Sequence, residues 1–117
     1  TARDLQDHQK AKGLPWEIAK AFDHSAVVGQ WQILSDTDKQ LPLQFCLAKN
    51  QQLVQQGQTS NMMYSFDKII AYISMYFSLN TGDLIFTGTP KGVGPVQIGD
   101  MLSAQLGDTE LLNFEIK

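Results

Sequence analysis

A glycine-rich segment at residues 82–94 constrains the fold of this 117-residue chain more than any other feature. It reads Gly-Asp-Leu-Ile-Phe-Thr-Gly-Thr-Pro-Lys-Gly-Val-Gly, so a short apolar run is followed by three glycines within seven residues. Glycine adopts positive φ angles easily and lets main-chain N–H groups come close to a bound oxygen. The hydroxyls of Thr87 and Thr89 flank Gly88 and can donate or accept hydrogen bonds there. The segment fits an anion-binding wall and, equally, a tight hairpin with a Pro-Lys-Gly turn.

Several functional classes are disfavoured by the sequence. The glycine segment lacks the spacing and the Gly-Lys-Ser/Thr ending of a Walker loop, and no Gly-x-Gly-x-x-Gly lies between a strand and a helix. The net charge is −3 and no cluster of Lys and Arg is present, so no nucleic-acid partner is expected. No apolar run reaches the roughly 18 residues that span a bilayer, so no membrane association is expected.

The apolar content of 43% is enough for the core of a single domain. Cys46 is the single cysteine, so no internal disulfide can form. This fits a reducing compartment, and we expect a cytoplasmic protein. Residues 43–47 around Cys46 have the composition of a strand, which favours a small buried residue over a nucleophile.

The periodicity predicts an α+β fold that is mostly β with one principal helix. Apolar residues three and four apart predict that helix over about residues 65–78, with Ser65 as its N-cap and one buried stripe. Residues 3–12 suit a short helix or an exposed loop that ends at Gly13, and residues 15–20 suit a second short helix. Extended segments are expected at 26–28, 31–34, 43–48, 52–56, 84–87, 99–106 and 111–116.

Two hairpins are expected among these segments. The first pairs residues 43–48 with 52–56 across Asn50 and Gln51. Gln51 carries a steric penalty at positive φ, so we expect this turn to be longer or of another type than an Asn-Gly turn. The second hairpin turns at Gly107 and Asp108.

Acidic residues gather at two places in the sequence. Asp4, Asp7 and His8 lie in a polar, Lys-rich stretch, where solvated charges are the ordinary explanation. Asp36 and Asp38 lie in a turn-like composition, in which side chains bond the local backbone. Neither group has the spacing of a metal site.

Four segments, in order, resemble the fumarylacetoacetate hydrolase family. The glycine segment matches the pattern Gly-Asp-Leu-Ile-x-Thr-Gly-Thr-Pro-x-Gly-Val-Gly of this family. The other three are Thr-Ala-Arg-Asp-Leu-Gln at 1–6, Gly-Leu-Pro-Trp at 13–16 with Ala-Lys-Ala-Phe-Asp at 19–23, and Gln-Gln-Gly-Gln-Thr-Ser-Asn-Met at 55–62. The resemblance implies the mixed β-roll of this family, incomplete in this chain. Residues 1–117 then form the C-terminal part of a single catalytic domain whose N-terminal part is absent.

The resemblance also implies roles for five residues. Lys20 is the catalytic residue, and its ammonium would stabilise an enolate or a tetrahedral oxyanion. Arg3 and Gln6 would bind the substrate, while Gly88 and Thr89 would hold its carboxylate from the opposite wall. We expect these residues to surround one cavity.

Without the resemblance, Arg3 and Lys20 would be interpreted as solvated surface charges. The apolar neighbours of Lys20, which are Ala19, Ala21 and Phe22, predict that its ammonium is partly desolvated.

The resemblance implies a metal-dependent hydrolase that breaks carbon–carbon bonds in small acylpyruvate or β-diketo acid substrates. The branch with compact acylpyruvases is the most similar, and the family implies Mg2+ or Mn2+ and a homodimer. In this family the metal ligands precede the position of Thr1, so we expect none in this chain and no activity from it alone. The alternatives are an oxaloacetate decarboxylase or 2-oxo acid isomerase of the same family, or a non-catalytic β module or fragment.

Overall fold

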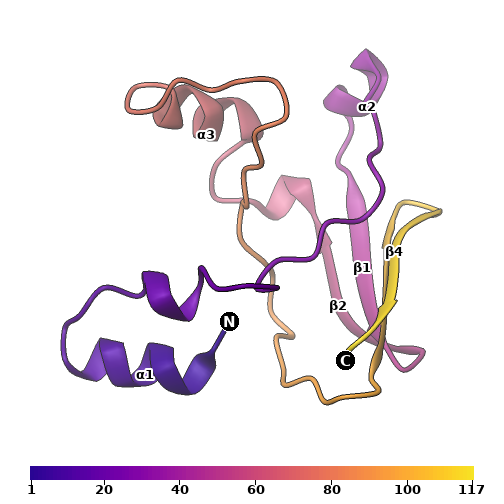
Figure 1. Ribbon diagram of the computed structural model, residues 1–117. Helices are drawn as coiled ribbons and strands as arrows, with labels where there is room; N and C mark the ends of the chain where they lie inside the picture. Colours follow the sequence, from indigo (N-terminus) through magenta and orange to yellow (C-terminus); the bar gives the residue numbers. More distant parts are fainter.

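A computed structural model describes the backbone of residues 1–117 and all side chains except those of residues 39 and 40. Its α+β architecture confirms the predicted fold class (Figure 1). The helices are α1 (Arg3–Ala11), α2 (Asp36–Gln40) and α3 (Phe66–Ile73), with 3-10 turns η1 (Glu17–Ala19) and η2 (Thr59–Asn61). The strands are β1 (Gln44–Lys49), β2 (Gln52–Gln58), β3 (Met101–Leu106) and β4 (Thr109–Glu115).

The four strands form one antiparallel sheet in the order β2-β1-β3-β4. Cys46 lies on β1 opposite Gln56 of β2 and Gln105 of β3, so the predicted strand is confirmed, but the side chain is half-buried rather than buried. Between β2 and β3 the chain leaves the sheet, forms η2 and α3, and returns through the glycine segment (Figure 1). That long connection therefore starts and ends at the sheet.

The turn between β1 and β2 differs from the prediction. It consists of Asn50 and Gln51 alone, with positive φ angles of 51° and 68°, which are the signs of a type I′ turn. Asn50 Nδ2 donates to Asp100 Oδ1 at 2.7 Å, and Asn50 Oδ1 accepts from the Met101 N–H at 2.8 Å. These long-range bonds fix Asn50 in the two-residue turn although Gln51 also has a positive φ angle, so the expectation of a longer or different turn was wrong. The predicted Gly107-Asp108 hairpin is confirmed.

Helix α3 starts where the sequence predicted and ends earlier. Ser65 is the N-cap, and its Oγ accepts from the Lys68 N–H at 3.4 Å. The helix stops at Ile73 rather than near residue 78, because the following N–H groups of Met75 and Tyr76 bond carbonyls three residues back. Helix α1 has a similar length, so α3 is not the single principal helix.

Four other segments depart from the prediction. Residues 26–28 and 31–34 form no strand, although the Gln30 N–H donates to the Leu111 carbonyl of β4 at 2.7 Å. Residues 84–87 likewise lie outside any strand. Residues 36–40, expected as a turn, form α2, because Ser35 and Asp38 make a capping box at its start.

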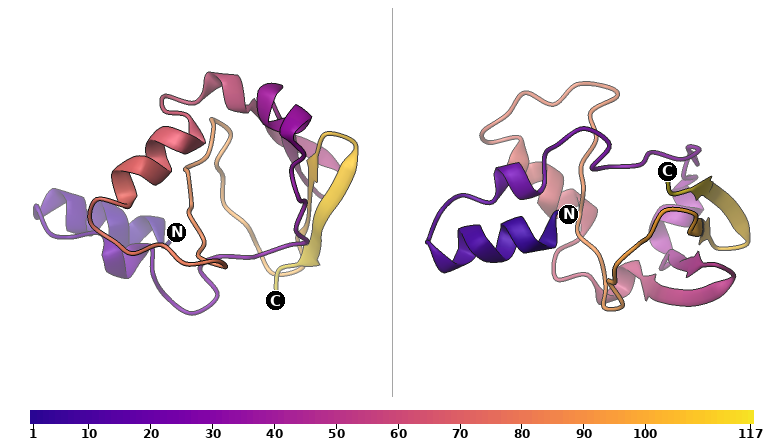
Figure 2. Two further views of the ribbon diagram at one scale, coloured as in Figure 1. Left: turned by 90° about the horizontal axis from the view of Figure 1, so that it is seen from above. Right: turned by 60° about the horizontal axis from the view of Figure 1, so that its bottom comes forward.

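Very little of this chain is buried. Ala19 is the only fully buried apolar side chain among those described, while Trp31, Ile33 and Met63 are 72%, 94% and 92% exposed. The accessible surface is 9670 Å² and the radius of gyration 16.0 Å, whereas a compact chain of this length has about 6400 Å² and about 13.4 Å. Figure 2 shows helices and sheet arranged as an open ring. The apolar content that is enough for a core is therefore not buried within the described part of this chain.

The predicted buried stripe of α3 illustrates this exposure. Ile69 and Ile73 are half-buried, but Phe66 and Ile70 on the same stripe are 39% and 45% exposed. Burying such side chains stabilises a fold by about 25 cal/mol per Å² of apolar surface. The exposed parts of Phe66 and Ile70 do not contribute this free energy in the chain as described.

We predict that the 117-residue polypeptide, produced alone, will not unfold cooperatively. Its exposed apolar side chains should bind the dye ANS strongly, and a two-state melt of this length would absorb about 80 kcal/mol. Calorimetry and dye fluorescence, with the full-length protein as the control, check this. A sharp calorimetric transition of that size in the isolated polypeptide would contradict the prediction.

A second prediction concerns Asp100, which joins β1, β3 and the loop before β3. Its carboxylate accepts from the Gln97 N–H at 2.8 Å and from Asn50 Nδ2, and lies 3.6 Å from Lys49 Nζ. These bonds, with that from Gln97 the strongest, hold the pKa of Asp100 below the ordinary 3.8. The carboxylate therefore contributes stability above that value, and the contribution is lost as the pH falls through the lowered pKa.

In the full-length protein, Asp100→Asn should lower the Tm at about pH 7, and its difference from wild type should shrink at about pH 2. Asp7→Asn, at an exposed position of α1, is the matched control and should leave the Tm unchanged. Thermal melts across this pH range test the prediction. A Tm difference between Asp100→Asn and wild type that grows as the pH falls would show that the carboxylate does not stabilise the fold in the way described.

Candidate functional site

Helix α1 folds back onto η1 and brings three predicted site residues onto one unit. Gly13, at φ 65°, ends the helix. The Ala2 N–H then donates to the Ala19 carbonyl at 3.1 Å, which ties the start of α1 to the end of η1. Arg3 and Gln6 belong to α1, and Lys20 follows η1 directly. The α1–η1 unit therefore carries three of the predicted site residues, two of them cationic and one an amide.

Gln6 is the buried residue of α1, with 9% of its surface exposed. Its Oε1 atom is buried and has no hydrogen-bond partner within the described part of the chain. A buried acceptor without a donor costs about 1–3 kcal/mol. Gln6 therefore suits a site at which a bound molecule or water supplies the missing donor.

Lys20 is exposed, so the predicted desolvation of its ammonium was wrong. Its Nζ donates to the Thr1 hydroxyl at 3.1 Å, and Lys20 lines an open hollow together with Leu14 and Trp16. Phe22, one of the neighbours expected to cover it, is itself 44% exposed. The ammonium is held in place by Thr1 rather than by apolar packing.

The glycine segment is an irregular loop, because residues 82–94 contain no strand, so the hairpin interpretation was wrong. Gly88 and Gly92 have φ angles of 97° and 102°. A Cβ on Gly92 would lie 2.2 Å from the Val54 carbonyl oxygen of β2. Only glycine permits that approach, so the segment is seated directly on β2.

Two further contacts seat the segment on β2. A Cβ on Gly57 would lie 2.7 Å from the Phe45 ring, so the absence of a side chain makes room for that ring, and the Pro90 ring packs close by, at 3.4 Å from the same Cβ position. Gln55 Nε2 donates to Thr89 Oγ1 at 2.9 Å and to the Pro90 carbonyl at 3.1 Å. The position of Thr89 is therefore set by β2.

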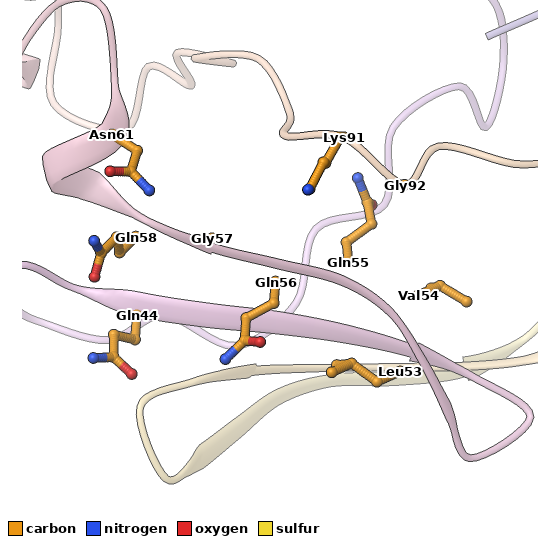
Figure 3. A pocket seen from close by; sticks show the side chains of 10 residues that line it. All are labelled: Gln44, Leu53, Val54, Gln55, Gln56, Gly57, Gln58, Asn61, Lys91 and Gly92. Atoms are coloured by element: carbon orange, nitrogen blue, oxygen red, sulfur yellow. The ribbon is translucent and has the colours of Figure 1, made fainter.

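A groove runs along β2 beneath the glycine segment. Figure 3 shows that Gln55 points toward the loop at Lys91 and Gly92, whereas Gln56 points to the opposite side of the strand. The groove is lined mainly by amide and small side chains: Gln44, Leu53, Val54, Gln55, Gln56, Gly57, Gln58, Asn61, Lys91 and Gly92.

The predicted site residues therefore fall into two groups. Arg3, Gln6 and Lys20 lie on the α1–η1 unit, whereas Gly88 and Thr89 lie over β2. In the views of Figures 1 and 2, the N-terminus lies beside the orange stretch of chain that contains the glycine segment. That the five residues surround one cavity stays a prediction.

The acidic residues behave as the sequence predicted at both places, and Asp4, Asp7 and His8 are exposed. Asp38 Oδ2 accepts from the Ser35 hydroxyl at 2.7 Å and from the Ser35 N–H at 2.9 Å, and these bonds lower the pKa of its carboxyl. Among the side chains that the structure describes, no three His, Cys, Asp or Glu residues gather as they would around a metal ion. No helix in the described part of the chain is long and apolar enough to cross a membrane.

Gln55 is the residue that the sequence reasoning missed. Its segment, residues 55–62, carried part of the family resemblance, but no role was assigned to the side chain. Its partners lie 34 and 35 residues away, so sequence spacing alone could not pair them.

Comparison with known proteins extends over the whole chain. Residues 1–116 match the model of the fumarylacetoacetate (FAA) hydrolase C-terminal family. The mitochondrial oxaloacetate tautomerase of Homo sapiens is 41% identical over 117 residues, which are 100% of this chain and 53% of that protein. The mitochondrial oxaloacetate tautomerase of Schizosaccharomyces pombe is 42% identical over 125 residues, covering 100% of this chain and 55% of its own length. The chain thus spans about half the length of these relatives.

Solved structures that superpose on this chain include a protein of the same family. A fumarylacetoacetate hydrolase family protein from Yersinia pestis superposes with a TM-score of 0.89 at 38% identity, covering 98% of this chain and 54% of its own. Fumarylpyruvate hydrolase from Pseudomonas aeruginosa, in complex with Mn2+ and pyruvate, superposes with a TM-score of 0.86 at 35% identity. It covers 97% of this chain and 49% of its own.

We predict that Gly92→Ala will destabilise the full-length protein by roughly 1–3 kcal/mol, because alanine is strained at this φ angle and its Cβ would meet the Val54 carbonyl. Gly94→Ala is the matched control, since a Cβ there has no neighbour within 4 Å. Denaturant unfolding measures both, and equal stabilities for the two variants would show that the loop is not seated on β2 as described.

Proposed function

The chain belongs to the fumarylacetoacetate hydrolase family, and on this basis we propose that it supplies part of the active site of an enzyme that acts on small 2-oxo acids through an enolate. The observation that supports the proposal is the α1–η1 unit, which brings together Arg3, Gln6 and Lys20, the three residues to which the sequence resemblance gives roles in substrate binding and catalysis. We further propose that residues 1–117 are the C-terminal part of a single catalytic domain.

The unit combines the groups that such a reaction needs. Arg3 can grip a carboxylate with two parallel N–H bonds. The ammonium of Lys20 can stabilise negative charge that develops on the oxygen of an enolate. The buried Oε1 of Gln6 has no hydrogen-bond donor in the described part of the chain. A hydroxyl group of the substrate, or a water molecule bound beside it, can donate that hydrogen bond.

The first candidate reaction is hydrolysis of the carbon–carbon bond in an acylpyruvate. Water adds to the distant carbonyl, the bond between that carbonyl carbon and the neighbouring CH2 breaks, and the electron pair becomes the enolate of pyruvate. A proton then returns to carbon, giving pyruvate and a second carboxylic acid. In this proposal Lys20 stabilises the enolate, and Thr89 and the Gly88 N–H hold the carboxylate that stays charged throughout.

The second candidate is tautomerisation of a 2-oxo acid, with oxaloacetate as its probe. This chain is 41% and 42% identical to the two oxaloacetate tautomerases but 35% identical to the fumarylpyruvate hydrolase. The greater identity to the tautomerases favours this second reaction. A proton leaves carbon and another binds the enolate oxygen, so each of the two reactions passes through the enolate of a 2-oxo acid. Assays of the full-length protein with an acylpyruvate and with the oxaloacetate enol separate them.

We propose Mg2+ or Mn2+ as the cofactor of the complete protein, because the Pseudomonas aeruginosa relative holds Mn2+ together with pyruvate. The described residues of this chain do not supply a ligand set for such an ion, so its ligands would have to come from elsewhere. A homodimer is a further proposal. Our expectation of a cytoplasmic protein stays a prediction, and the two named tautomerases are mitochondrial proteins.

In the full-length protein, we predict that Lys20→Ala will lower kcat about 10²-fold, or about 3 kcal/mol of barrier, with little change in KM. Arg3→Ala should mainly raise KM, because the carboxylate that it binds is charged in both the ground state and the transition state. Steady-state kinetics on both variants provide the measurement.

Lys10→Ala, at another exposed lysine of α1, is the control and should behave as wild type. If Lys20→Ala keeps kcat within about threefold of wild type, a change below about 1 kcal/mol, then Lys20 has a structural role only.

A further inference from the structure

We propose that Gln55 is a positioning residue, which orients the Thr89 hydroxyl so that it donates its hydrogen to the substrate carboxylate. This inference rests on the proposed function, in which Thr89 holds that carboxylate. Gln55 lies half-buried on β2, and its Nε2 is 2.9 Å from Thr89 Oγ1 and 3.1 Å from the Pro90 carbonyl oxygen. Both partners belong to the glycine segment.

The Pro90 carbonyl determines which way the amide of Gln55 faces. A carbonyl oxygen can only accept, so the end of the amide that approaches it must be the NH2 group. This group has two hydrogens, and the second is available for Thr89 Oγ1. The Thr89 hydroxyl therefore accepts a hydrogen bond from Gln55.

This bond determines what the Thr89 hydroxyl can do next. A hydroxyl has one hydrogen and two lone pairs. Because an N–H of Gln55 occupies one lone pair, the hydroxyl hydrogen cannot point toward that amide and is directed away from it. A carboxylate offers only acceptors, so it pairs with a hydroxyl that is already oriented as a donor. Gln55 thus removes the orientational cost of that pairing before the substrate binds.

The loop has other anchors, so the effect of Gln55 can be separated from loss of the loop. Gly92 is seated against the Val54 carbonyl, and the Pro90 ring packs close to Gly57. These contacts depend on backbone and ring atoms, which remain when the amide of Gln55 is replaced. A variant of Gln55 therefore changes the hydrogen bonding of Thr89 while the segment stays on β2.

The test uses the full-length protein and a double-mutant cycle. Gln55→Met keeps the length of the side chain and removes the donor, and Thr89→Val keeps the shape of the side chain and removes the hydroxyl. Gln52→Met is the matched control, since Gln52 is an exposed glutamine of β2 that is not among the residues lining the groove. The readouts are KM and kcat with the substrate that the enzyme turns over, and the Kd of pyruvate.

We expect Gln55→Met and Thr89→Val each to raise KM and the Kd of pyruvate about tenfold, with kcat changed less. The double variant should be no worse than Thr89→Val alone, within about twofold, because Gln55 acts only through the hydroxyl. Gln52→Met should match wild type. If Gln55→Met fails to fold, Gln55→Glu replaces it, and its carboxylate should also raise KM by drawing the hydroxyl hydrogen toward itself.

Two outcomes overturn the inference alone. One is a Gln55 variant with wild-type KM beside a Thr89→Val variant with raised KM. The other is a double variant whose effect is the product of the single ones, about 100-fold, which would mean that Gln55 acts independently of Thr89. A wild-type protein that neither binds pyruvate nor converts any 2-oxo acid would instead overturn the proposed function, and this inference with it.

Discussion

The docking of the glycine segment on β2 is the contact on which the candidate site depends. Gly92 approaches the Val54 carbonyl too closely for any side chain, and the amide of Gln55 joins the two segments at Thr89 and Pro90. β2 is hydrogen-bonded to β1, and β1 to β3. A loop that is anchored to β2 is therefore held in place by the whole sheet. A loop fixed in this way can present N–H and O–H donors without ordering them anew for each ligand, which lowers the entropic cost of binding.

Local signals in the sequence predicted the features that local interactions determine. The cap at Ser65, the helix stop at Gly13 and the Gly107-Asp108 hairpin follow from the preferences of single residues, and all three occur in the structure. The tight turn at Gln51 could not be predicted in this way, because bonds from the distant Asp100 and Met101 support it. Gln55 was missed for the same reason. The family motifs located Lys20 and Thr89, but no spacing rule could predict that Thr1 would hold Lys20.

The exposed apolar side chains are the largest departure from expectation. Periodicity identifies which face of α3 is apolar, but it does not identify what covers that face. In this chain Ile70 and Phe66 remain partly open, and the surface exceeds that of a compact chain by about half. The relatives are about twice as long as this chain. We propose that residues corresponding to their additional length, or a second copy of the chain, cover these exposed apolar side chains. The site would then be only one wall of a larger enclosure.

The link between Asn50 and Asp100 has a consequence for how the chain folds. These residues are 50 positions apart, and their bond closes a loop that contains α3 and the whole glycine segment. Closing a long loop costs entropy before its contacts return any stability, whereas the β1–β2 hairpin needs only two turn residues. We therefore expect the hairpin to form early and the segment that carries Thr89 to reach β2 late. Substitutions in that segment would then change the rate of unfolding more than the rate of folding.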